Sequence, residues 1–339
     1  MKRMRVRILI VLWLAASGGL FADDRAIAEA YRVRALALMA RNDAHAAAAL
    51  LEESIDYYPR YSETLYLLGT LYATDQETTR RGIELVEKAL AAADWSVTPV
   101  RVAEETLIRL YVRTKRFREA LERIDGLRRE RTSSPALEAL RGKAFYGRGD
   151  RASGSAVFER ALELYPNDRE LYRRYIQNLL SRGISPRART LVVRARREFP
   201  DDPEFVYFQF YLTDSASDKK DLFNTYTSLG GKNPRLILLY PDAGEAEYAA
   251  LLEMVAAAGG FDDLGILEAL LARVKNNPAR HRNISARLEK LDGEKIVDEN
   301  ADGYYEEKYF FARGRLTRMF FDFNQDGLAE TEIFFDGVR

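Results

Sequence analysis

The sequence predicts a mainly α protein built from stacked helical hairpins, followed by a small antiparallel β meander at the C-terminus. Two internal repeats support this. In the body of the chain, Pro166, Pro200 and Pro234 recur every 34 residues, a period that accommodates one pair of helices. Near the C-terminus, segments 298–311 and 322–335 are identical at seven of fourteen positions with an offset of 24 residues. Each of these segments has the pattern of a strand, a loop and a second strand.

Residues 1–22 have the features of a secretory signal peptide. Four basic residues between positions 2 and 7 precede an apolar run at 8–16, which is followed by small residues and two aspartates. We expect cleavage after Ala22, with Gly19 as the second choice. An uncleaved anchor is the alternative, but the apolar run is shorter than the ~20 residues that a spanning helix needs. We therefore expect no membrane span after cleavage, and a periplasmic or secreted bacterial location.

Composition excludes several classes of function. The chain has 52 basic and 52 acidic residues, and removal of residues 1–22 leaves 48 basic against 52 acidic ones. This lacks the basic excess that is typical of nucleic-acid binders. No cysteine is present, so disulfides, thiolate metal sites, a lipid-modified N-terminal Cys and a thiol nucleophile are excluded.

Residues 23–236 are predicted to form the helical repeats, and the segment from Gly142 to Pro166 resembles a tetratricopeptide (TPR) repeat. The positions that carry the resemblance are Gly142, Phe145, Gly154, Phe158, Ala161 and Pro166. Two antiparallel helices approach closely only where small residues face the neighbouring helix, and large residues then fill the flanking space. The resemblance implies a right-handed α-solenoid.

The same frame places the starts of the repeat units along the chain. These starts are Ala28, Ser62, Arg101, Pro135, Arg169 and Pro203. The second and third starts are 39 residues apart. A longer turn with five extra residues is therefore expected within 73–82 or 92–99.

Residues 237–292 are interpreted as degenerate repeats that cap the solenoid. Two amphipathic helices separated at Gly259 and Gly260 are expected there, with a third helix from His281 to Leu291. A terminal unit has to cover the last apolar face of the array.

Residues 293–339 are predicted to form the four-stranded meander, from about Glu294 to Phe335, with a turn at 312–315. Period-two alternation predicts a sheet with one buried face. The residues expected on that face are Tyr309, Phe311, Met319, Phe321, Ile333 and Phe335. The residues expected on the opposite face are Glu306, Lys308, Arg318 and Glu332.

Enzymatic chemistry is not predicted. The chain has two histidines, His45 and His281, and neither belongs to a recognisable catalytic arrangement, so both are expected to be exposed. The segment Leu229 to Pro234 lacks the rest of a phosphate-binding loop. No organic cofactor is expected.

The TPR resemblance implies a concave groove lined by the fifth and ninth positions of each first helix. The residues at these positions are Arg32, Leu36, Tyr66, Thr70, Glu105, Arg109, Ala139, Lys143, Arg173, Gln177, Tyr207 and Tyr211. Arg109, Lys143 and Arg173 form a predicted basic stripe, and Tyr207 with Tyr211 an aromatic end. Together with Tyr66 and Gln177, this lining suits an extended peptide that bears carboxylates. The alternative is an ordinary solvated surface with local ion pairs.

The two loops of the β tail have the spacing of calcium ligands. In the second loop, positions 1, 3, 5, 7 and 9 are Asp322, Asn324, Asp326, Leu328 (through its carbonyl) and Glu330. In the first loop they are Asp298, Asn300, Asp302, Tyr304 and Glu306. The loops resemble the nine-residue calcium hairpins of FG-GAP and VCBS repeats, which implies two weak Ca²⁺ sites. The alternative is a pair of Asx-rich turns that bind no metal.

These features favour an exported interaction scaffold that binds a protein or peptide in the concave face of the solenoid, in a cell-envelope or transporter-associated assembly. The alternative is a surface adhesin or glycan-binding module that acts through the calcium-binding tail. The sequence leaves a homo-oligomer open and favours no nucleic-acid partner.

Overall fold

The computed structural model describes residues 20–129, 133–181, 183–258, 264–275, 278, 281–282, 285–286, 292–298 and 305–335. Residues 1–19 lie outside this set, and with them most of the expected signal peptide. The first described helix, α2 (Leu20–Met39), begins three residues before the expected mature start at Asp23. The alternative cleavage after Gly19 would fall immediately before this helix.

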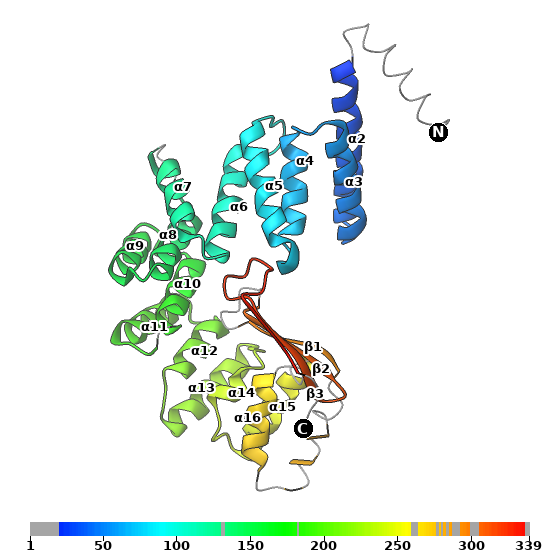
Figure 1. Cartoon of the computed structure of the whole chain (residues 1–339). Coiled ribbons are helices and arrows are strands. Elements are labelled where there is room, and N and C mark those ends of the chain that lie inside the picture. The colour runs from blue at the N-terminus through cyan, green and yellow to red at the C-terminus, as the bar shows by residue number, and fades with distance from the viewer. Residues whose placement is uncertain are drawn as a thin grey trace. The chain divides into compact units, whose positions relative to one another are not determined.

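Helices form most of the chain and follow one another in antiparallel pairs (Figure 1). The pairs are α2 with α3 (Ala44–Tyr57), α4 (Ser62–Tyr72) with α5 (Thr79–Ala92), α8 (Pro135–Gly147) with α9 (Arg151–Leu164), α10 (Arg169–Leu180) with α11 (Pro186–Glu198), and α12 (Pro203–Tyr211) with α13 (Ala216–Ser228). Between the second and third of these pairs, α6 (Val100–Arg113) packs against α5, and α7 (Phe117–Arg129) packs against α8. Helices α4, α8, α10 and α12 begin at the predicted residues. The predicted fold class, a TPR-like α-solenoid with a small antiparallel sheet, is confirmed.

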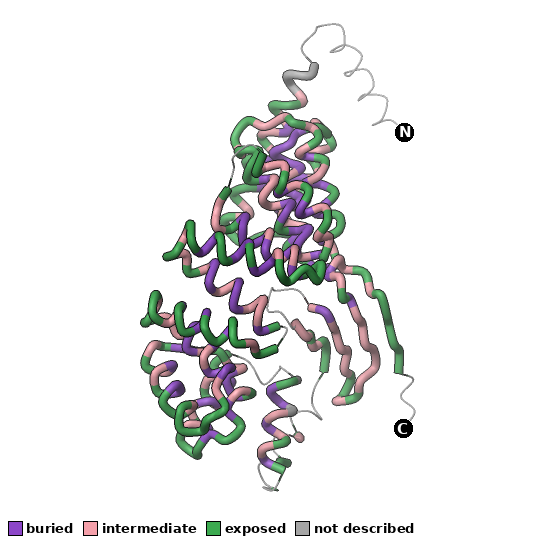
Figure 2. The backbone as a smooth tube through the Cα atoms, turned by 90° about the vertical axis from the view of Figure 1, so that its left-hand side faces the viewer, coloured by how far each residue is buried: buried purple, intermediate pink, exposed green. Residues whose placement is uncertain are grey.

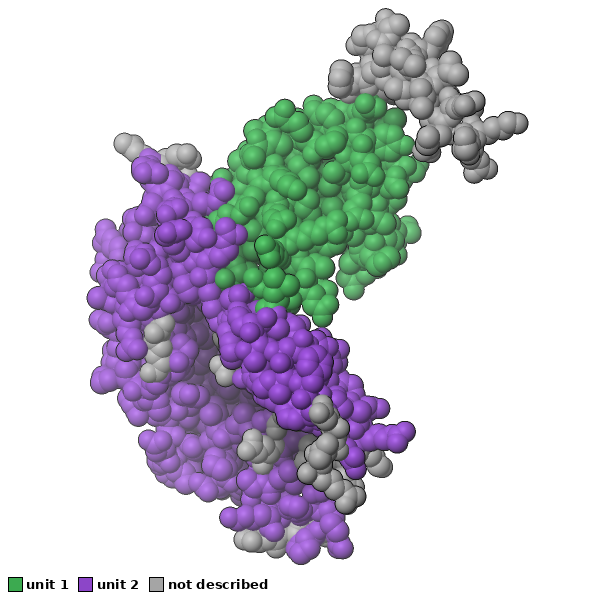
Figure 3. All heavy atoms as spheres, viewed as in Figure 1, with its two compact units in different colours: residues 1–114, 326–328 green, residues 115–325, 329–339 purple. Residues whose placement is uncertain are grey.

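The chain divides into two compact units, which Figure 3 colours separately. Unit 1 comprises residues 1–114 and 326–328, and unit 2 comprises residues 115–325 and 329–339. The helical core of unit 1 is made of small and aliphatic side chains from α2 to α5. Its buried members are Ala35, Ala47, Leu51, Leu65, Leu68, Leu85 and Ala89.

In unit 2, the packing of α8 against α9 depends on glycine, as the sequence predicts. A Cβ atom on Gly142 would lie 2.4 Å from the ring of Phe158, and one on Gly154 would lie 2.7 Å from the ring of Tyr146. Phe158 is fully buried and stacks on Tyr175 of the next repeat with ring centroids 4.7 Å apart. These rings join adjacent hairpins into one core.

Much of the extra length of the second unit lies after α5, in the loop 93–99, which has seven residues where the loops after α9 and α11 have four each. A buried carboxylate closes this loop. Glu63 is 1% exposed, and its Oε1 accepts hydrogen bonds from the backbone N–H groups of Ser96 (3.0 Å), Val97 (2.6 Å) and Thr98 (2.8 Å). Its Oε2 accepts one from the Thr98 hydroxyl at 2.5 Å. The insertion is therefore an ordered loop tied to α4.

Beyond α13, unit 2 contains α14 (Leu236–Leu239), α15 (Glu245–Ala257) and α16 (Leu264–Val274). Side chains of all three join the buried cluster that also includes α12 and α13. The predicted break at Gly259 and Gly260 lies outside the described residues. Of the third predicted helix, residues 281–282 and 285–286 are helical, and the remainder of 281–291 lies outside the described set.

The tail is a four-stranded antiparallel meander with the order β1 (Gly293–Val297), β2 (Glu307–Ala312), β3 (Arg315–Phe321) and β4 (Thr331–Phe334). The turn between β2 and β3 has two residues with positive φ, Arg313 (52°) and Gly314 (70°). This is the requirement of a type I′ hairpin turn, whose twist matches that of the strands. The predicted turn is therefore confirmed.

The prediction of one buried sheet face is wrong. Tyr309, Met319 and Ile333 do lie side by side, but Ile333 is 41% exposed. Figure 2 shows the strands mainly as intermediate or exposed. A bulge between Phe310 and Phe311 also shifts the register, so that Phe311 pairs with Leu316 and the alternation is interrupted.

The opposite sheet face mixes cations with aromatic rings. Phe310, Arg318 and Phe334 are cross-strand neighbours, and the Arg318 guanidinium lies 4.6 Å from the Phe310 ring centroid and 5.6 Å from that of Phe334. Lys308 pairs with Glu294 of β1 at 2.6 Å. Cation–π contacts and ion pairs of this kind stabilise a sheet that has little buried apolar surface.

Candidate functional site

A hollow of about 260 Å³ in unit 2 gathers four of the predicted groove residues. Its lining consists of Lys143, Arg174, Gln177, Asn178, Leu180, Ser181, Tyr207, Phe208 and Tyr211. Lys143, Gln177 and Tyr211 are the ninth residues of α8, α10 and α12, and Tyr207 is the fifth residue of α12. The repeat frame thus brings equivalent positions of three consecutive first helices to one surface.

Capping residues set the starts of these three helices and therefore the positions of their groove residues. The Ser134 hydroxyl accepts from the N–H of Leu137 (3.2 Å) at the start of α8, where Pro135 occupies the first helical position. Carboxylates cap the other two helices. Asp168 Oδ1 accepts a hydrogen bond from the N–H of Leu171 in α10 (2.8 Å), and Asp202 Oδ1 accepts one from the N–H of Glu204 in α12 (2.9 Å). A side-chain cap satisfies backbone N–H groups that have no partner within the helix.

The predicted basic stripe is altered in unit 2 by local ion pairs. Arg173 forms a bidentate pair with Glu170, with both N–O distances at 2.6 Å, and lies 3.7 Å from Glu204. Its charge is therefore compensated by carboxylates of the same chain. Arg174, which is not one of the predicted groove residues, lines the hollow instead and pairs with Glu170 at 2.7 Å.

The two carboxyl groups near Arg173 have pKa values that are shifted in opposite directions. Hydrogen bonds from Arg173 hold the pKa of Glu170 below its usual value, against the effect of burial. Burial raises the pKa of Glu204, although Arg173 and Arg169 act against this. Glu170 is thus the firmly ionised partner of both neighbouring arginines.

The aromatic end of the hollow combines a largely covered ring with an open one. Burial raises the pKa of the Tyr207 hydroxyl, and Arg235 opposes this shift. Tyr211 is 40% exposed. The hollow can therefore offer cations and side-chain amides at one end, and aromatic surface at the other.

The predicted groove residues of unit 1 differ in their exposure and in their contacts. Arg109 is exposed on α6. Tyr66 packs edge-on against Trp95, with centroids 6.0 Å apart, and its hydroxyl lies 3.2 Å from that of Thr106. Arg32 is buried and pairs with Glu29. Tyr66 thus contacts the loop 93–99 and α6, whereas Arg32 pairs within its own helix.

The remaining groove positions vary in exposure. Leu36 is exposed, and Glu105 is half-buried and pairs with Arg101 at 2.9 Å. The Thr70 hydroxyl donates to the Leu67 carbonyl at 2.8 Å. Ala139 is buried.

Of the calcium-type loops, the second is described in full and the first only at Asp298, Tyr305 and Glu306, so Asn300, Asp302 and Tyr304 lie outside the described residues. In the second loop, Gly327 has φ 90°, as expected for the sharp turn at position 6. Glu330 accepts hydrogen bonds from the Phe323 N–H (2.7 Å) and the Asn324 amide (2.5 Å).

The other acidic positions of the second loop are used differently. Asp326 accepts from the Leu328 N–H at 2.9 Å, and Asp322 is fully buried. Within the described part of the chain, no three His, Cys, Asp or Glu side chains are grouped as they would be around a metal ion. Calcium binding therefore remains a prediction.

Both histidines are exposed, as predicted. His281 also has a contact that the sequence does not predict, since its Nδ1 lies 3.3 Å from the hydroxyl of Ser285, one helical turn later. This pair is a surface contact. Across the described ranges, no helix is both long and apolar enough to cross a membrane.

No protein-family profile and no curated protein matches the chain. Solved structures similar to it include MamA from Desulfovibrio magneticus RS-1, with 16% identity over 51% of this chain and 93% of that chain and a TM-score of 0.42. PilF of Pseudomonas aeruginosa has 16% identity over 78% and 99%, with a TM-score of 0.40. YrrB, described as a TPR protein with an unusual peptide-binding site, has 14% identity over 71% and 98%, with a TM-score of 0.35. We draw no functional argument from these similarities.

Proposed function

We propose that the protein is an exported interaction scaffold that binds an extended peptide segment of a partner protein in the hollow formed by α8, α10 and α12. The observation that carries this proposal is that ninth-position residues of three consecutive first helices line one concavity. Equivalent positions on successive repeats recur at regular spacing, which suits a linear ligand that contacts one repeat after another. Export is inferred from the basic and apolar segments of the N-terminus.

The chemistry of the lining specifies the peptide class. Lys143 and Arg174 can pair with an acidic side chain of the peptide, although Arg174 already pairs with Glu170, as Arg173 also does. Gln177 carries both donors and an acceptor, so it can bond the backbone of an extended peptide. Tyr207 and Tyr211 provide rigid aromatic area for an apolar or aromatic anchor. We therefore expect an acidic residue followed by an apolar one.

A display library of random peptides, selected on the full chain, tests this proposal. We expect enriched sequences to combine Asp or Glu with an aromatic or aliphatic residue. The variant Lys143→Glu with Arg174→Glu should bind the best synthetic peptide at least about tenfold more weakly, which corresponds to about 1.4 kcal/mol. The matched control, Arg151→Glu with Arg197→Glu, alters two exposed arginines outside the hollow.

The control and the test variant change the net charge equally, so the comparison separates local contacts from long-range attraction. Equal weakening in both variants would mean that the peptide is held by overall charge. Selected peptides that bind the native chain and the variant Lys143→Glu with Arg174→Glu equally well would contradict the proposal.

A further inference from the structure

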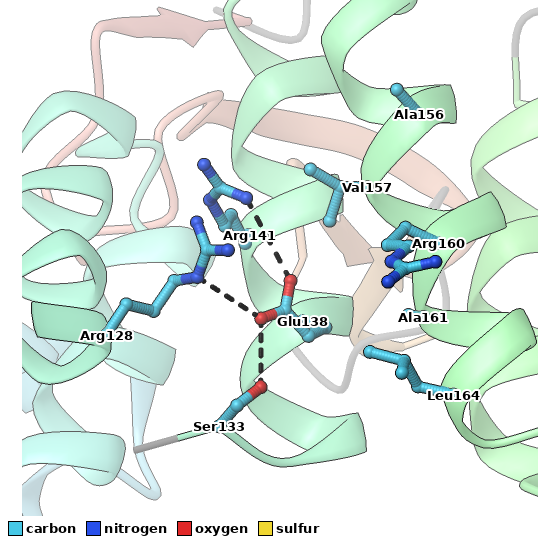
Figure 4. Close-up of a pocket in the computed structure, with 9 residues that line it drawn as sticks. All are labelled: Arg128, Ser133, Glu138, Arg141, Ala156, Val157, Arg160, Ala161 and Leu164. Atoms are coloured by element: carbon cyan, nitrogen blue, oxygen red, sulfur yellow. Dashed lines mark hydrogen bonds and ion pairs between the residues drawn. The ribbon is translucent and has the colours of Figure 1, made fainter. Parts of the chain in front are cut away.

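A second hollow in unit 2, of about 520 Å³, lies between α7, α8 and α9 (Figure 4). Its lining is made of Arg128, Ser133, Glu138, Arg141, Ala156, Val157, Arg160, Ala161 and Leu164. No residue of this set lines the peptide hollow described above. Its volume is in the range of about 300–1,000 Å³ that is typical of small-molecule sites.

One wall of this hollow is polar and has more cations than anions. Glu138 is 7% exposed and lies between Arg128 and Arg141, as Figure 4 shows. Arg160 is on the facing helix, where it bonds Glu163 at 2.7 Å. The lining thus contains three guanidinium groups and a single carboxylate.

The contacts within the polar wall leave hydrogen-bonding capacity on its arginines. Glu138 accepts a bond from the Ser133 hydroxyl at 3.0 Å. Its distances to Arg128 Nε and Arg141 Nη1 are 3.5 and 4.0 Å, which are longer than a hydrogen bond of about 2.7–3.2 Å. The buried Nε of Arg141 has no hydrogen-bond partner among the described residues. Asp125 is 3.8 Å from this nitrogen and is also too distant for a hydrogen bond.

Electrostatics at Arg141 agree with this geometry. Burial lowers the pKa of Arg141, and the positive charge of Arg128 lowers it further, while Glu138 and Asp125 act in the opposite direction. An additional anion beside the two guanidinium groups would offset this repulsion. If this anion is a carboxylate, its two oxygen atoms can also accept a pair of parallel hydrogen bonds from one planar guanidinium group.

The opposite wall is apolar and is formed by one face of α9. Ala156, Val157, Ala161 and Leu164 contribute only aliphatic carbon from their side chains. Leu164 is 55% exposed. A ligand that joined a carboxylate to an aliphatic chain could thus satisfy the arginines and cover this wall at once.

We propose that this hollow is a binding site for a small aliphatic carboxylate, with its carboxylate between Arg128 and Arg141 and its chain against α9. The site is independent of the peptide hollow, so either proposal can fail without the other. The same chemistry exists at the carboxyl terminus of a peptide that ends in leucine, and the experiment separates the two sources.

Isothermal titration calorimetry with sodium octanoate on the full chain tests the proposal. For a ligand of this size we expect a Kd of about 1 mM. Acetate, which lacks the chain, and 1-octanol, which lacks the charge, should each bind at least about tenfold more weakly. Arg141→Gln should weaken octanoate binding by about tenfold, because it removes the charge-assisted contacts. The control Arg151→Gln, on an exposed arginine of α9, should leave it unchanged.

A second variant keeps the test valid if Arg141→Gln unfolds, as checked by circular dichroism. Ala156 is exposed at the rim of the hollow, so Ala156→Phe should fill the space and abolish octanoate binding without entering the core. Absence of saturable binding up to about 10 mM octanoate, or equal affinity in the native chain, Arg141→Gln and Ala156→Phe, would overturn the proposal. Tighter binding by an acetylated peptide with a C-terminal leucine carboxylate than by octanoate would overturn the assignment to a small molecule.

Discussion

Removal of the Glu63 carboxylate should free the loop 93–99 in unit 1. Glu63 accepts hydrogen bonds from three backbone N–H groups and one hydroxyl group of this loop. A hydrogen bond to a charged group contributes about 1.5–3 kcal/mol net. Ser96 and Val97 are exposed, so water can replace part of what is lost. We therefore expect Glu63→Ala to destabilise the loop by about 3 kcal/mol. This figure is the loss of two of the four hydrogen bonds at about 1.5 kcal/mol each.

Amide hydrogen exchange measures this effect where it arises. A loss of about 3 kcal/mol corresponds to roughly 100-fold faster exchange at Ser96, Val97 and Thr98. The control Glu84→Ala alters an exposed carboxylate of α5 that lies 3.7 Å from Arg80, and surface pairs of this kind contribute about 0–1 kcal/mol. Unchanged protection of the three amides in Glu63→Ala, or equal acceleration in the control, would refute the reasoning.

The same carboxylate predicts a pH dependence. Burial acts to raise the pKa of Glu63, but the Thr98 hydroxyl and the backbone N–H groups of Val97, Thr98 and Ser96 outweigh it and hold the pKa below the ordinary 4.5. A depressed pKa in the folded state means that stability is fully present above the unfolded value and is lost as pH falls through the folded value. The difference in Tm between the native chain and Glu63→Gln should therefore be largest at neutral pH and shrink in acid. A difference that grew as the pH fell would contradict this assignment.

Two further predictions concern packing and metal binding. Gly142→Ala should lower the free energy of unfolding by about 1–3 kcal/mol, because the new Cβ would lie 2.4 Å from Phe158. Gly126→Ala, where nothing lies within 4 Å of the new Cβ, should instead raise it by about 0.5–1 kcal/mol, and thermal unfolding of both variants checks the contrast. For calcium, calorimetric titration of the full chain should give a Kd of ~0.1–1 mM and lose its heat in Asp302→Asn with Asp326→Asn. Equal heat in both proteins, or none in either, would leave only the Asx-turn interpretation.

The repeat architecture could be predicted because it depends on local and periodic signals. The caps Ser134, Asp168 and Asp202 and the starts of their helices are encoded within a few residues. The close approach at Gly142 is visible in the sequence because a TPR hairpin needs a small residue there. The extra length of the second unit could also be predicted, because the predicted starts of the second and third repeat units are farther apart than one repeat.

Features that depend on contacts between distant residues could not be predicted in the same way. Arg173 and Arg174 are adjacent in the sequence, and the position of Glu204 from the next repeat helps to determine which carboxylates compensate Arg173. The role of Glu63 depends on a loop more than thirty residues later. Alternation in the tail predicted a sheet, but burial depends on what covers a sheet, and no periodicity in the strands themselves specifies that.

The calcium-type spacing of the tail loops is compatible with two uses of the same residues, as metal ligands or as turn-forming groups. Positions 1, 3, 5 and 9 of the second loop carry oxygen atoms in the right order, yet Glu330 and Asn324 bond each other. Asx-rich turns satisfy their own backbone with the same residue types. Spacing alone therefore does not distinguish the two uses of these residues.

The central claim, that the hollow of α8, α10 and α12 binds an acidic, apolar peptide, is tested most directly by fluorescence anisotropy. The best peptide from the display selection would be titrated with the native chain, with Lys143→Glu plus Arg174→Glu, and with the control Arg151→Glu plus Arg197→Glu, at about 0.15 M salt, where exposed charges are screened beyond about 8 Å. We predict that the first variant binds at least about tenfold more weakly while the control matches the native chain. Equal affinity in all three proteins would contradict the assignment of this hollow as the peptide site.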